Sequence, residues 1–375
     1  MAQTNYSATV LYPLILPSGF EPGSEVLSPA SPGQAVVAGQ AVSNGINAAT
    51  ANSQNALVWT TPGGLVTDLN PAGFTTSYAL ATDGAQQVGF GTANATDDAL
   101  LWSGTAASAV ILNPSGISDM IAVGIGGGQE VGYGDVPSAD LTQHAFLWSG
   151  TAASAVDLTP TLEGGRADAL ATDGVQQVGY YKDSGSSLEA MLWSGTAASA
   201  VNLNPTNLPG ILLSAAIAVG GAQQVGFCIE PGGDNYTHAV LWSGTGASAV
   251  DLNPTGLTGL VQSIADGTNG FQQVGYGTTL TNLNEALLWS GSAGSAIDLQ
   301  SLLPSVGTWT QSMACSIDPM GNVYGIATGT LDGVTGNFAV EWSPVPEPGT
   351  VTLLAAFAAG LLMRRRRTAT LRRSL

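Results

Sequence analysis

Few residues of this chain are of the types that do acid–base, nucleophilic or metal chemistry. Its 375 residues contain two histidines, His144 and His238, and two cysteines, Cys228 and Cys315. Imidazole nitrogens serve as bases and metal ligands, and thiolates act as nucleophiles or bind soft metals. The cysteines are too few for a disulfide framework and form no Cys-x-x-Cys pair, so we expect two buried free thiols. Two such histidines support no Ser/His/Asp catalytic set.

Both histidines occupy one position of an internal repeat, at the start of an expected strand and four residues before a tryptophan. Polar residues of other kinds, and once a phenylalanine, stand there in other copies of the repeat: Asn55, Asp98, Glu189, Glu285 and Phe338. The two histidines belong to repeats two apart, so we do not expect them to converge. We interpret them as solvent-facing residues at strand ends and predict no catalytic residue, no cofactor and no bound metal.

Four aspartates, Asp83, Asp173, Asp266 and Asp318, recur near one end of the repeats. Asp accepts local backbone hydrogen bonds in turns, and a ring of carboxylates could alternatively bind Ca²⁺. No repeat has the dense Asp-x-Asp-x-Asp-Gly spacing of a calcium loop, so turn geometry is the favoured role. The glycine-rich residues 124–128 lack a lysine and open no helix, which makes them a turn rather than a phosphate cradle.

The elements that would position these residues come from a repeat that recurs about every 45 residues. In the fourth copy, short apolar segments cover 167–171, 176–181, 190–193 and 198–203, separated by turn residues. Four strand-sized segments per unit are typical of a β-propeller blade. An apolar block ending in tryptophan marks each of seven copies: Trp59, Trp102, Trp148, Trp193, Trp242, Trp289 and Trp342. The sequence therefore predicts an all-β, seven-bladed propeller with these tryptophans between the blades.

The two ends of the repeat region are complementary. The last copy stops after Trp342 and lacks the Ser-Gly-x-x-x-Ser-Ala run that follows other tryptophans, which we expect to form a strand. The N-terminal residues 7–13 resemble the segment 248–254, which completes the fifth copy. We predict that the N-terminal strand completes the last blade and closes the ring, which removes exposed sheet edges. An open β-solenoid is the alternative, but it would not need matched ends.

The charge is divided between two unlike parts of the chain. The chain has 8 Lys and Arg against 26 Asp and Glu, which gives a net charge of −18 and leaves no basic surface for a nucleic acid. Residues 1–348 contain only two of the bases, Arg166 and Lys182, and carry a net charge of −24. Residues 349–375 carry +6. We place the boundary between a propeller domain over 1–343 and a tail over 344–375.

The tail consists of three parts in a fixed order. A proline-rich motif is followed by the uncharged apolar stretch 351–363 and then by the first four arginines of the basic end. The stretch would be about 20 Å long as a helix, short of the ~30 Å hydrocarbon core, and adjacent arginines stay on the cytoplasmic side. We predict a short transmembrane helix that leaves the propeller outside the cytoplasm. The motif and the basic end are Val345, Pro346, Glu347, Pro348 and Arg364, Arg365, Arg366, Arg367.

This tail resembles the PEP-CTERM protein-sorting signal of Gram-negative bacteria. The resemblance implies cleavage by an exosortase-type membrane protease and release to the cell surface or an exopolysaccharide matrix. Such proteins also carry a signal peptide, and Met1 runs directly into the first expected strand, so we expect the start codon to have been placed too late. The repeats resemble HAF-type extracellular repeats, through residues 144–148 (His-Ala-Phe-Leu-Trp) and 238–242. That resemblance implies an exported propeller-like domain and supplies no catalytic residues.

Three functions follow from these features. The first is a surface or matrix protein that is not an enzyme. Its propeller would bind an exopolysaccharide or a surface protein. The second is a carbohydrate-binding propeller, for which Tyr181, Tyr236 and Trp309 are the candidate loop aromatics. The third is a polysaccharide-active enzyme, which would need cationic groups beside carboxylates, and the body offers only Arg166 and Lys182 for that role.

Overall fold

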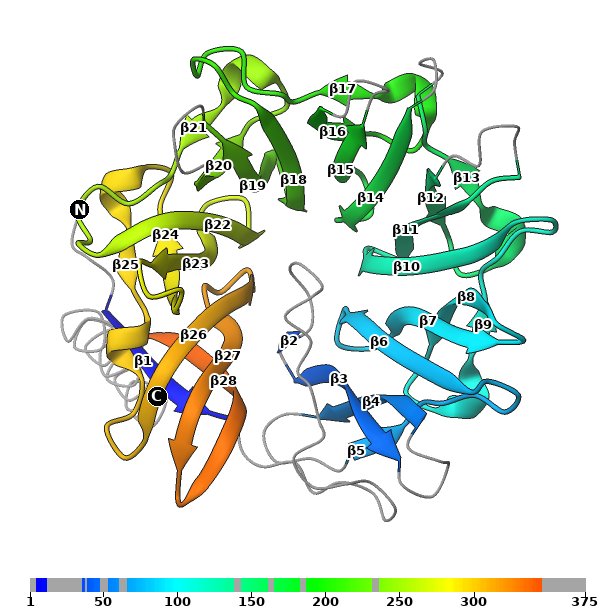
Figure 1. Cartoon of the computed structure of the whole chain (residues 1–375), viewed down its shortest axis with the longest axis horizontal. Coiled ribbons are helices and arrows are strands. Elements are labelled where there is room, and N and C mark those ends of the chain that lie inside the picture. The colour runs from blue at the N-terminus through cyan, green and yellow to red at the C-terminus, as the bar shows by residue number, and fades with distance from the viewer. Residues whose placement is uncertain are drawn as a thin grey trace, which may run out of the picture.

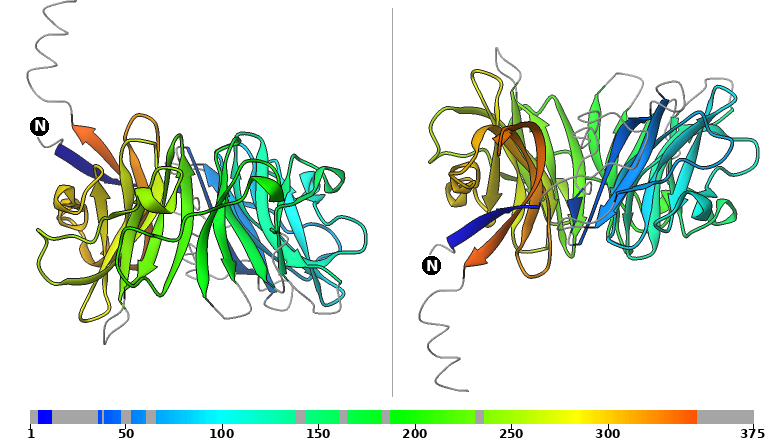
Figure 2. Two further views of the ribbon diagram at one scale, coloured as in Figure 1. Left: turned by 90° about the horizontal axis from the view of Figure 1, so that it is seen from above. Right: turned by 90° about the horizontal axis from the view of Figure 1, so that it is seen from below.

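The chain forms a flat ring of seven four-stranded antiparallel sheets around a central axis (Figures 1 and 2). This computed structural model describes residues 5–11, 36–37, 39–47, 53–60, 66–137, 143–160, 165–182, 187–230 and 236–345. The first strand of each of blades 1–6 and β26 of blade 7 lie nearest the axis, and the fourth strand lies at the rim. The predicted all-β, seven-bladed β-propeller is therefore confirmed.

The strands of the blades run from the axis outwards in chain order. Blade 1 consists of β2 (Val36–Val37), β3 (Gln40–Asn47), β4 (Ser53–Thr60) and β5 (Val66–Asp68). Blade 2 consists of β6 (Thr76–Thr82), β7 (Gln87–Ala93), β8 (Thr96–Trp102) and β9 (Val110–Ile111). Blade 3 consists of β10 (Ser118–Gly126), β11 (Gln129–Asp135), β12 (Gln143–Trp148) and β13 (Val156–Asp157). Blade 4 consists of β14 (Arg166–Thr172), β15 (Gln177–Lys182), β16 (Leu188–Trp193) and β17 (Val201–Asn202).

The remaining blades follow the same plan, except that the last one takes its rim strand from the N-terminus. Blade 5 consists of β18 (Leu213–Gly220), β19 (Gln223–Ile229), β20 (Thr237–Trp242) and β21 (Val250–Asp251). Blade 6 consists of β22 (Leu260–Thr268), β23 (Gln273–Thr279), β24 (Asn284–Trp289) and β25 (Ile297–Asp298). Blade 7 consists of β26 (Thr308–Ile317), β27 (Val323–Leu331), β28 (Val334–Val345) and β1 (Asn5–Val10).

The N-terminal strand closes the ring as predicted. The strand β1, blue in Figure 1, pairs antiparallel with the orange β28, with Ala8 opposite Trp342. Residues of the last and first blades then share one buried cluster, in which Tyr324 and Ile326 pack with Val36 and Leu57. Because β1 pairs with the outer side of β28, that strand has no unpaired edge, and the shared core joins the last blade to the first.

The Ser-Gly-x-x-x-Ser-Ala run is a turn and not the strand that we predicted. In blade 4 it forms the 3₁₀-helix η4 (Ala197–Ser199), and the rim strand that follows has only two residues. The hydroxyl of Ser199 donates to the carbonyl of Thr196 and accepts the N–H of Ser194, at 2.6 and 2.7 Å. These local bonds compete with a ladder and close the turn. The equivalent 3₁₀-helices are η2 (Ala106–Ser108), η3 (Ala152–Ser154), η5 (Gly246–Ser248) and η6 (Ala293–Ser295), and η7 (Gln300–Leu302) follows β25.

The repeated tryptophans form the core between blades, as predicted. Six of them are 0% exposed and Trp59 is 5% exposed. Trp193 of blade 4, for example, packs with Val131 and Leu147 of blade 3. Burying one large apolar side chain contributes roughly 1.5–3 kcal/mol, so these seven contacts hold neighbouring blades together.

The glutamines of the repeated Gln-Gln-Val-Gly block connect successive blades. Gln177 of blade 4 donates to Gln129 of blade 3 at 2.9 Å and accepts the backbone N–H of Gly195 at 2.8 Å. The same bonds between neighbouring blades recur at 2.7–3.0 Å in three other pairs: Gln87 to Gln40, Gln224 to Gln176 and Gln273 to Gln223. The repeat therefore keeps a donor and an acceptor at one buried position.

Blade 3 departs from this pattern at the position of the second glutamine. Glu130 takes the place of the second glutamine and is 1% exposed, and its carboxylate accepts the N–H of Gly150 at 2.8 Å. An ionised carboxylate cannot donate to Gln86 of blade 2, and burial raises the pKa of Glu130. We expect Glu130→Gln to stabilise the protein by about 1 kcal/mol, because the amide restores the missing donor.

The gain from Glu130→Gln should grow with pH. When folding raises the pKa of a carboxyl group, the free energy of unfolding falls as pH rises from the unfolded-state pKa through the folded-state pKa. Urea unfolding at pH 5 and pH 8 measures both effects. Gln177→Glu in blade 4 is the reverse control and should destabilise the protein. Equal stability of Glu130→Gln and wild type at both pH values would contradict the proposed donor role.

Candidate functional site

A polar pair bridges the third and fourth strands at the rim of several blades. One partner is the residue four positions before the tryptophan, and the other is thirteen residues further along the chain. These pairs are complementary in chemistry: Asn55 donates to Asp68 at 2.9 Å, His144 contacts Asp157 at 2.6 Å, and Asn202 donates to Glu189 at 2.7 Å. The histidine position found in the sequence is thus one half of a cross-strand pair.

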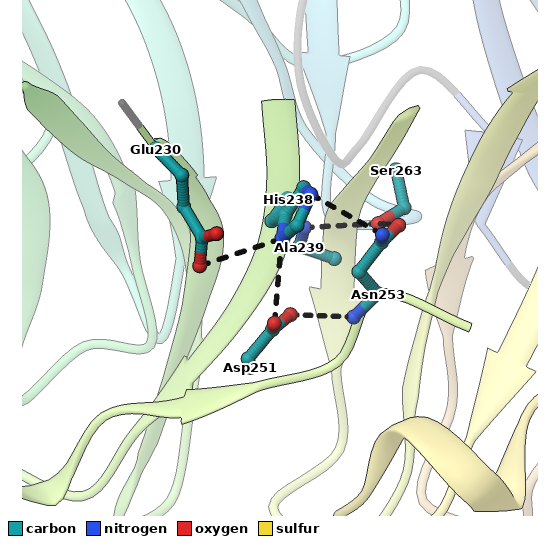
Figure 3. Close-up of polar contacts among 6 residues, drawn as sticks. All are labelled: Glu230, His238, Ala239, Asp251, Asn253 and Ser263. Carbon is teal, nitrogen blue, oxygen red and sulfur yellow. Dashed lines mark hydrogen bonds and ion pairs between the residues drawn. The ribbon is translucent and has the colours of Figure 1, made fainter. Parts of the chain in front are cut away.

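Blade 5 adds a third ligand-type side chain to this pair (Figure 3). His238 Nδ1 lies 3.3 Å from Asp251 Oδ2 and 3.6 Å from Glu230 Oε1. The three donor atoms all lie within 4.8 Å of one another. Glu230 follows β19 directly, His238 is in β20 and Asp251 is in β21, so consecutive strands of one sheet bring them together.

A chain of hydrogen bonds fixes the orientation of the His238 ring (Figure 3). Ser263 of blade 6 accepts the N–H of Ala239 at 3.0 Å and donates to Asn253 Oδ1 at 2.8 Å. The amide nitrogen of Asn253 therefore faces His238 Nε2, at 3.2 Å. With Nε2 accepting, the neutral ring carries its proton on Nδ1, toward Asp251; this tautomer is assigned from the network.

The charges around His238 favour a cation. The hydrogen bond to Asp251 raises the pKa of His238, burial opposes this, and Glu230 adds to the increase. The side chains of Glu230 and Asp251 are 37% and 35% exposed and that of His238 is 20% exposed. Among the residues that the structure describes, the only ion pairs are those of the two histidines. The cluster therefore offers one imidazole and two carboxylates without a lysine or arginine.

The structure corrects the expectation for the histidines in part. They lie at strand starts in blades 3 and 5 and do not converge, as predicted. They are not solvent-facing, because their side chains are only 22% and 20% exposed and each contacts a carboxylate. The repeat pattern did not predict the aspartate partners, although the His-to-Asp spacing is thirteen residues in both blades. Glu230 was not predicted either, because it lies outside the repeated blocks.

Three of the four aspartates have the predicted turn role. Asp83 Oδ1, for instance, accepts the N–H groups of Ala85 and Gln86 at 2.9 and 2.8 Å, and Asp173 and Asp318 do the same in their blades. The prediction for Asp266 is wrong: it lies within β22 and is 7% exposed. Asn269 holds the turn of blade 6 instead. Burial raises the pKa of Asp266 to about 8.

The candidate aromatic residues are mostly occupied in packing. Tyr181 is 3% exposed, and Trp309 packs edge-on against Phe338 while its indole N–H donates to Pro304. Tyr236 is partly buried. Phe271, which we did not single out, is 83% exposed on the turn between β22 and β23. An exposed aromatic of this kind was not visible in the repeat, since its position carries other residue types elsewhere.

The two cysteines are buried thiols, and most of the tail lies outside the described residues. Cys228 and Cys315 are free and buried, as expected, and burial raises the pKa of both thiols to about 12, so they are unreactive at neutral pH. Val345 ends β28, whereas Pro346, Glu347 and Pro348, the apolar stretch 351–363 and Arg364 to Arg367 lie outside the described residues. In the described ranges, no helix has the length and hydrophobicity needed to cross a membrane.

The fold defines the class of the described region as a seven-bladed β-propeller, and solved structures agree with that fold. The propeller domain of the Trilobed protease from Pyrococcus furiosus, described as having an open velcro topology, superposes with a TM-score of 0.51 at 7% identity, over 84% of this chain and 94% of that domain. An acylaminoacyl peptidase gives 0.50 at 8% identity over 82% of this chain. No protein-family model and no curated protein matches the sequence.

These similarities extend to the fold alone. The chain spans 50% of the length of the acylaminoacyl peptidase and 58% of TolB from Acinetobacter baumannii, which superposes with a TM-score of 0.40 at 12% identity. Unlike the open topology described for the Pyrococcus domain, the ring here is closed by β1. No activity is carried over from these proteins at such identity.

Proposed function

We propose that this chain is an exported bacterial cell-surface or extracellular-matrix protein with a non-enzymatic, partner-binding role. The observation that carries the proposal is the position of the sorting motif. The last strand β28 ends at Val345, the first residue of that motif, and β1 has already completed the last blade. A protease acting in the tail would thus release a propeller that keeps every described strand.

Repeated grooves at the rim support a binding role. In blade 3 a groove of about 570 Å³ is lined by Phe146, Ala152 and Asp157. In blade 4 the equivalent residues Met191, Ala197 and Asn202 line a groove of about 440 Å³. A 3₁₀-helix forms part of each wall, so the repeat offers similar apolar and polar groups at successive positions. Repetition of this kind suits an extended partner such as a polymer.

The net charge of the released protein would restrict the kinds of partner that it can bind. Removal of residues 349–375 takes away a charge of +6 and leaves a strongly acidic propeller. Such a surface repels anionic polymers at low ionic strength and favours neutral, cationic or metal-bridged partners. An exopolysaccharide of neutral sugars or a surface protein fits this requirement.

Sorting can be tested in a host that has an exosortase-type protease, with the full chain preceded by a signal peptide. We expect the wild type to reach the cell surface without its terminal arginines, as mass spectrometry would show. A variant with Pro346, Glu347 and Pro348 all replaced by alanine should remain uncleaved at the inner membrane. The same host without the protease is the control. Cleavage of the variant, or a wild type that stays in the cytoplasm uncleaved, would contradict the proposal.

Carbohydrate binding is the second candidate, and exposed Phe271 favours it. Aromatic side chains on loops provide flat apolar surfaces for sugar rings. A glycan array with the wild type and Phe271→Ala distinguishes a sugar-binding face from the rim grooves. Turnover of neutral or acidic polysaccharides in a parallel activity screen would exclude the non-enzymatic role.

A further inference from the structure

We propose that Glu230, His238 and Asp251 bind a divalent metal ion of the Zn²⁺ class at the rim of blade 5 (Figure 3). Imidazole with two carboxylates is a donor set that suits Zn²⁺, whereas Ca²⁺ and Mg²⁺ prefer sites made of oxygen alone. This site does not depend on export or on a polysaccharide partner.

The spacing of the donor atoms fits a small ion. Zinc bonds of about 2.0–2.2 Å in tetrahedral geometry hold neighbouring ligand atoms roughly 3.3–3.5 Å apart. His238 Nδ1 lies 3.3 Å from Asp251 Oδ2 and 3.6 Å from Glu230 Oε1. The Glu230 and Asp251 oxygens lie within 4.8 Å of each other, so side-chain rotations can bring the three ligand atoms to this spacing without movement of β20 and β21. Three protein ligands leave the fourth position to water.

The neighbours of His238 supply a second shell. A metal-bound histidine usually donates its other ring N–H to a fixed acceptor. When the metal takes Nδ1 of the neutral ring, the ring proton belongs on Nε2, which then donates to Asn253 after the amide turns over. Asn253 can make this change because of the Ser263 hydroxyl. This hydroxyl donates to the amide oxygen in the present structure, and it can instead accept from the amide nitrogen after the turn. If His238 is protonated beforehand, one proton is released to solvent.

Blade 3 contains a natural control for this site. His144 and Asp157 pair there as His238 and Asp251 do in blade 5. Strand register makes Asp135 equivalent to Ile229, so the residue that corresponds to Glu230 is Val136. Among the residues that the structure describes, blade 3 thus has two of the three ligands, and the proposal requires it to bind much more weakly.

The two histidines allow a direct test in the full chain. Zn²⁺ is titrated in by calorimetry, and the ring protons of His144 and His238 are followed by NMR. We expect one saturable equivalent that changes the His238 signals and leaves those of His144 in place. Glu230→Gln, which keeps size and removes charge, should weaken Zn²⁺ binding by more than about tenfold, and Asn253→Leu by about tenfold.

A gain-of-site variant provides a second measurement. Val136→Glu supplies in blade 3 the carboxylate that Glu230 provides in blade 5, and it should create a second Zn²⁺ equivalent that changes the His144 signals. Circular dichroism without metal checks that each variant is folded. The proposal is overturned if Zn²⁺ shows no saturable binding, if it affects both wild-type histidines equally, or if Glu230→Gln binds as tightly as the wild type. Failure of Val136→Glu to create a site would contradict the three-ligand argument.

Discussion

Gly179→Ala is expected to destabilise the protein by about 3 kcal/mol, although it adds a single methyl group. Gly179 lies in β15 opposite the point where β14 shifts register between Ala169 and Ala171. A Cβ on Gly179 would stand 1.9 Å from the carbonyl oxygen of Asp168. Because that oxygen belongs to the backbone of the inner strand, relief of the clash requires distortion of the β14–β15 ladder.

The same clash explains the glycine at this position in each of blades 2–7. An added Cβ would lie 1.8–2.1 Å from an inner-strand carbonyl oxygen at the equivalent glycines: Gly89, Gly132, Gly226, Gly275 and Gly325. Gly294→Ala is the matched control, since no heavy atom lies within 4 Å of its added Cβ and Ala107 stands at the equivalent place in blade 2. It should be neutral or stabilising by up to about 0.5 kcal/mol. Similar unfolding midpoints for the two variants would refute the clash.

Asp266→Asn is expected to stabilise the protein strongly at alkaline pH and little at pH 4. Asp266 occupies the extra residue of the register shift in β22, between Ala265 and Gly267. Apolar residues occupy the equivalent places in other blades: Leu80, Val123, Leu170, Ile217 and Cys315. Burial is the sole cause that raises the pKa of Asp266 to about 8, and no residue of the described ranges hydrogen-bonds to its carboxylate.

The direction of the pH effect follows from proton linkage. Between its unfolded pKa of about 3.9 and its folded pKa, Asp266 binds more protons in the folded state, so the free energy of unfolding falls as pH rises. Each pKa unit corresponds to about 1.4 kcal/mol, so we expect Asp266→Asn to gain at least about 3 kcal/mol at pH 9. Denaturant unfolding of wild type and variant from pH 4 to pH 9 measures this difference.

The control for Asp266→Asn is Asp83→Asn. Asp83 accepts two backbone N–H groups in an exposed turn, and Asn269 already makes the same contacts in blade 6. We therefore expect Asp83→Asn to change stability by less than about 0.5 kcal/mol at any pH between 4 and 9. If the Asp266→Asn and wild-type curves ran parallel across this range, Asp266 would not be a buried acid of raised pKa.

The repeat pattern predicted the fold well because a blade is specified locally. Four short segments, a tryptophan and turn residues recur in each copy, and a unit of that size buries its apolar faces only against neighbouring units. The matched ends, residues 7–13 and the truncated seventh copy, predicted closure by β1. The predicted fourth segment, 198–203, is a strand only at Val201–Asn202, because the hydrogen bonds of the Ser199 hydroxyl form a 3₁₀ turn at its start.

The candidate site was less predictable, because its parts lie in different segments of a blade. The sequence marked His238 as a repeat position but gave no reason to join it to Glu230 or Asp251. Register between strands β19, β20 and β21 sets those contacts, and Glu230 lies where the copies differ. Asp266 was misplaced for a similar reason, since a shift of register moves an apparent turn residue into a buried strand.

The sequence by itself determined the number of blades, the ring closure, the buried tryptophans and the division between an acidic body and a basic tail. These features follow from the composition of the chain and from a pattern that recurs in each repeat. Only the tertiary structure decided which glutamine bridges which blade, why one glycine in each of blades 2–7 admits no side chain, and that one imidazole and two carboxylates meet at the rim of blade 5. Those contacts depend on register and on packing between strands, which a repeat period leaves undetermined.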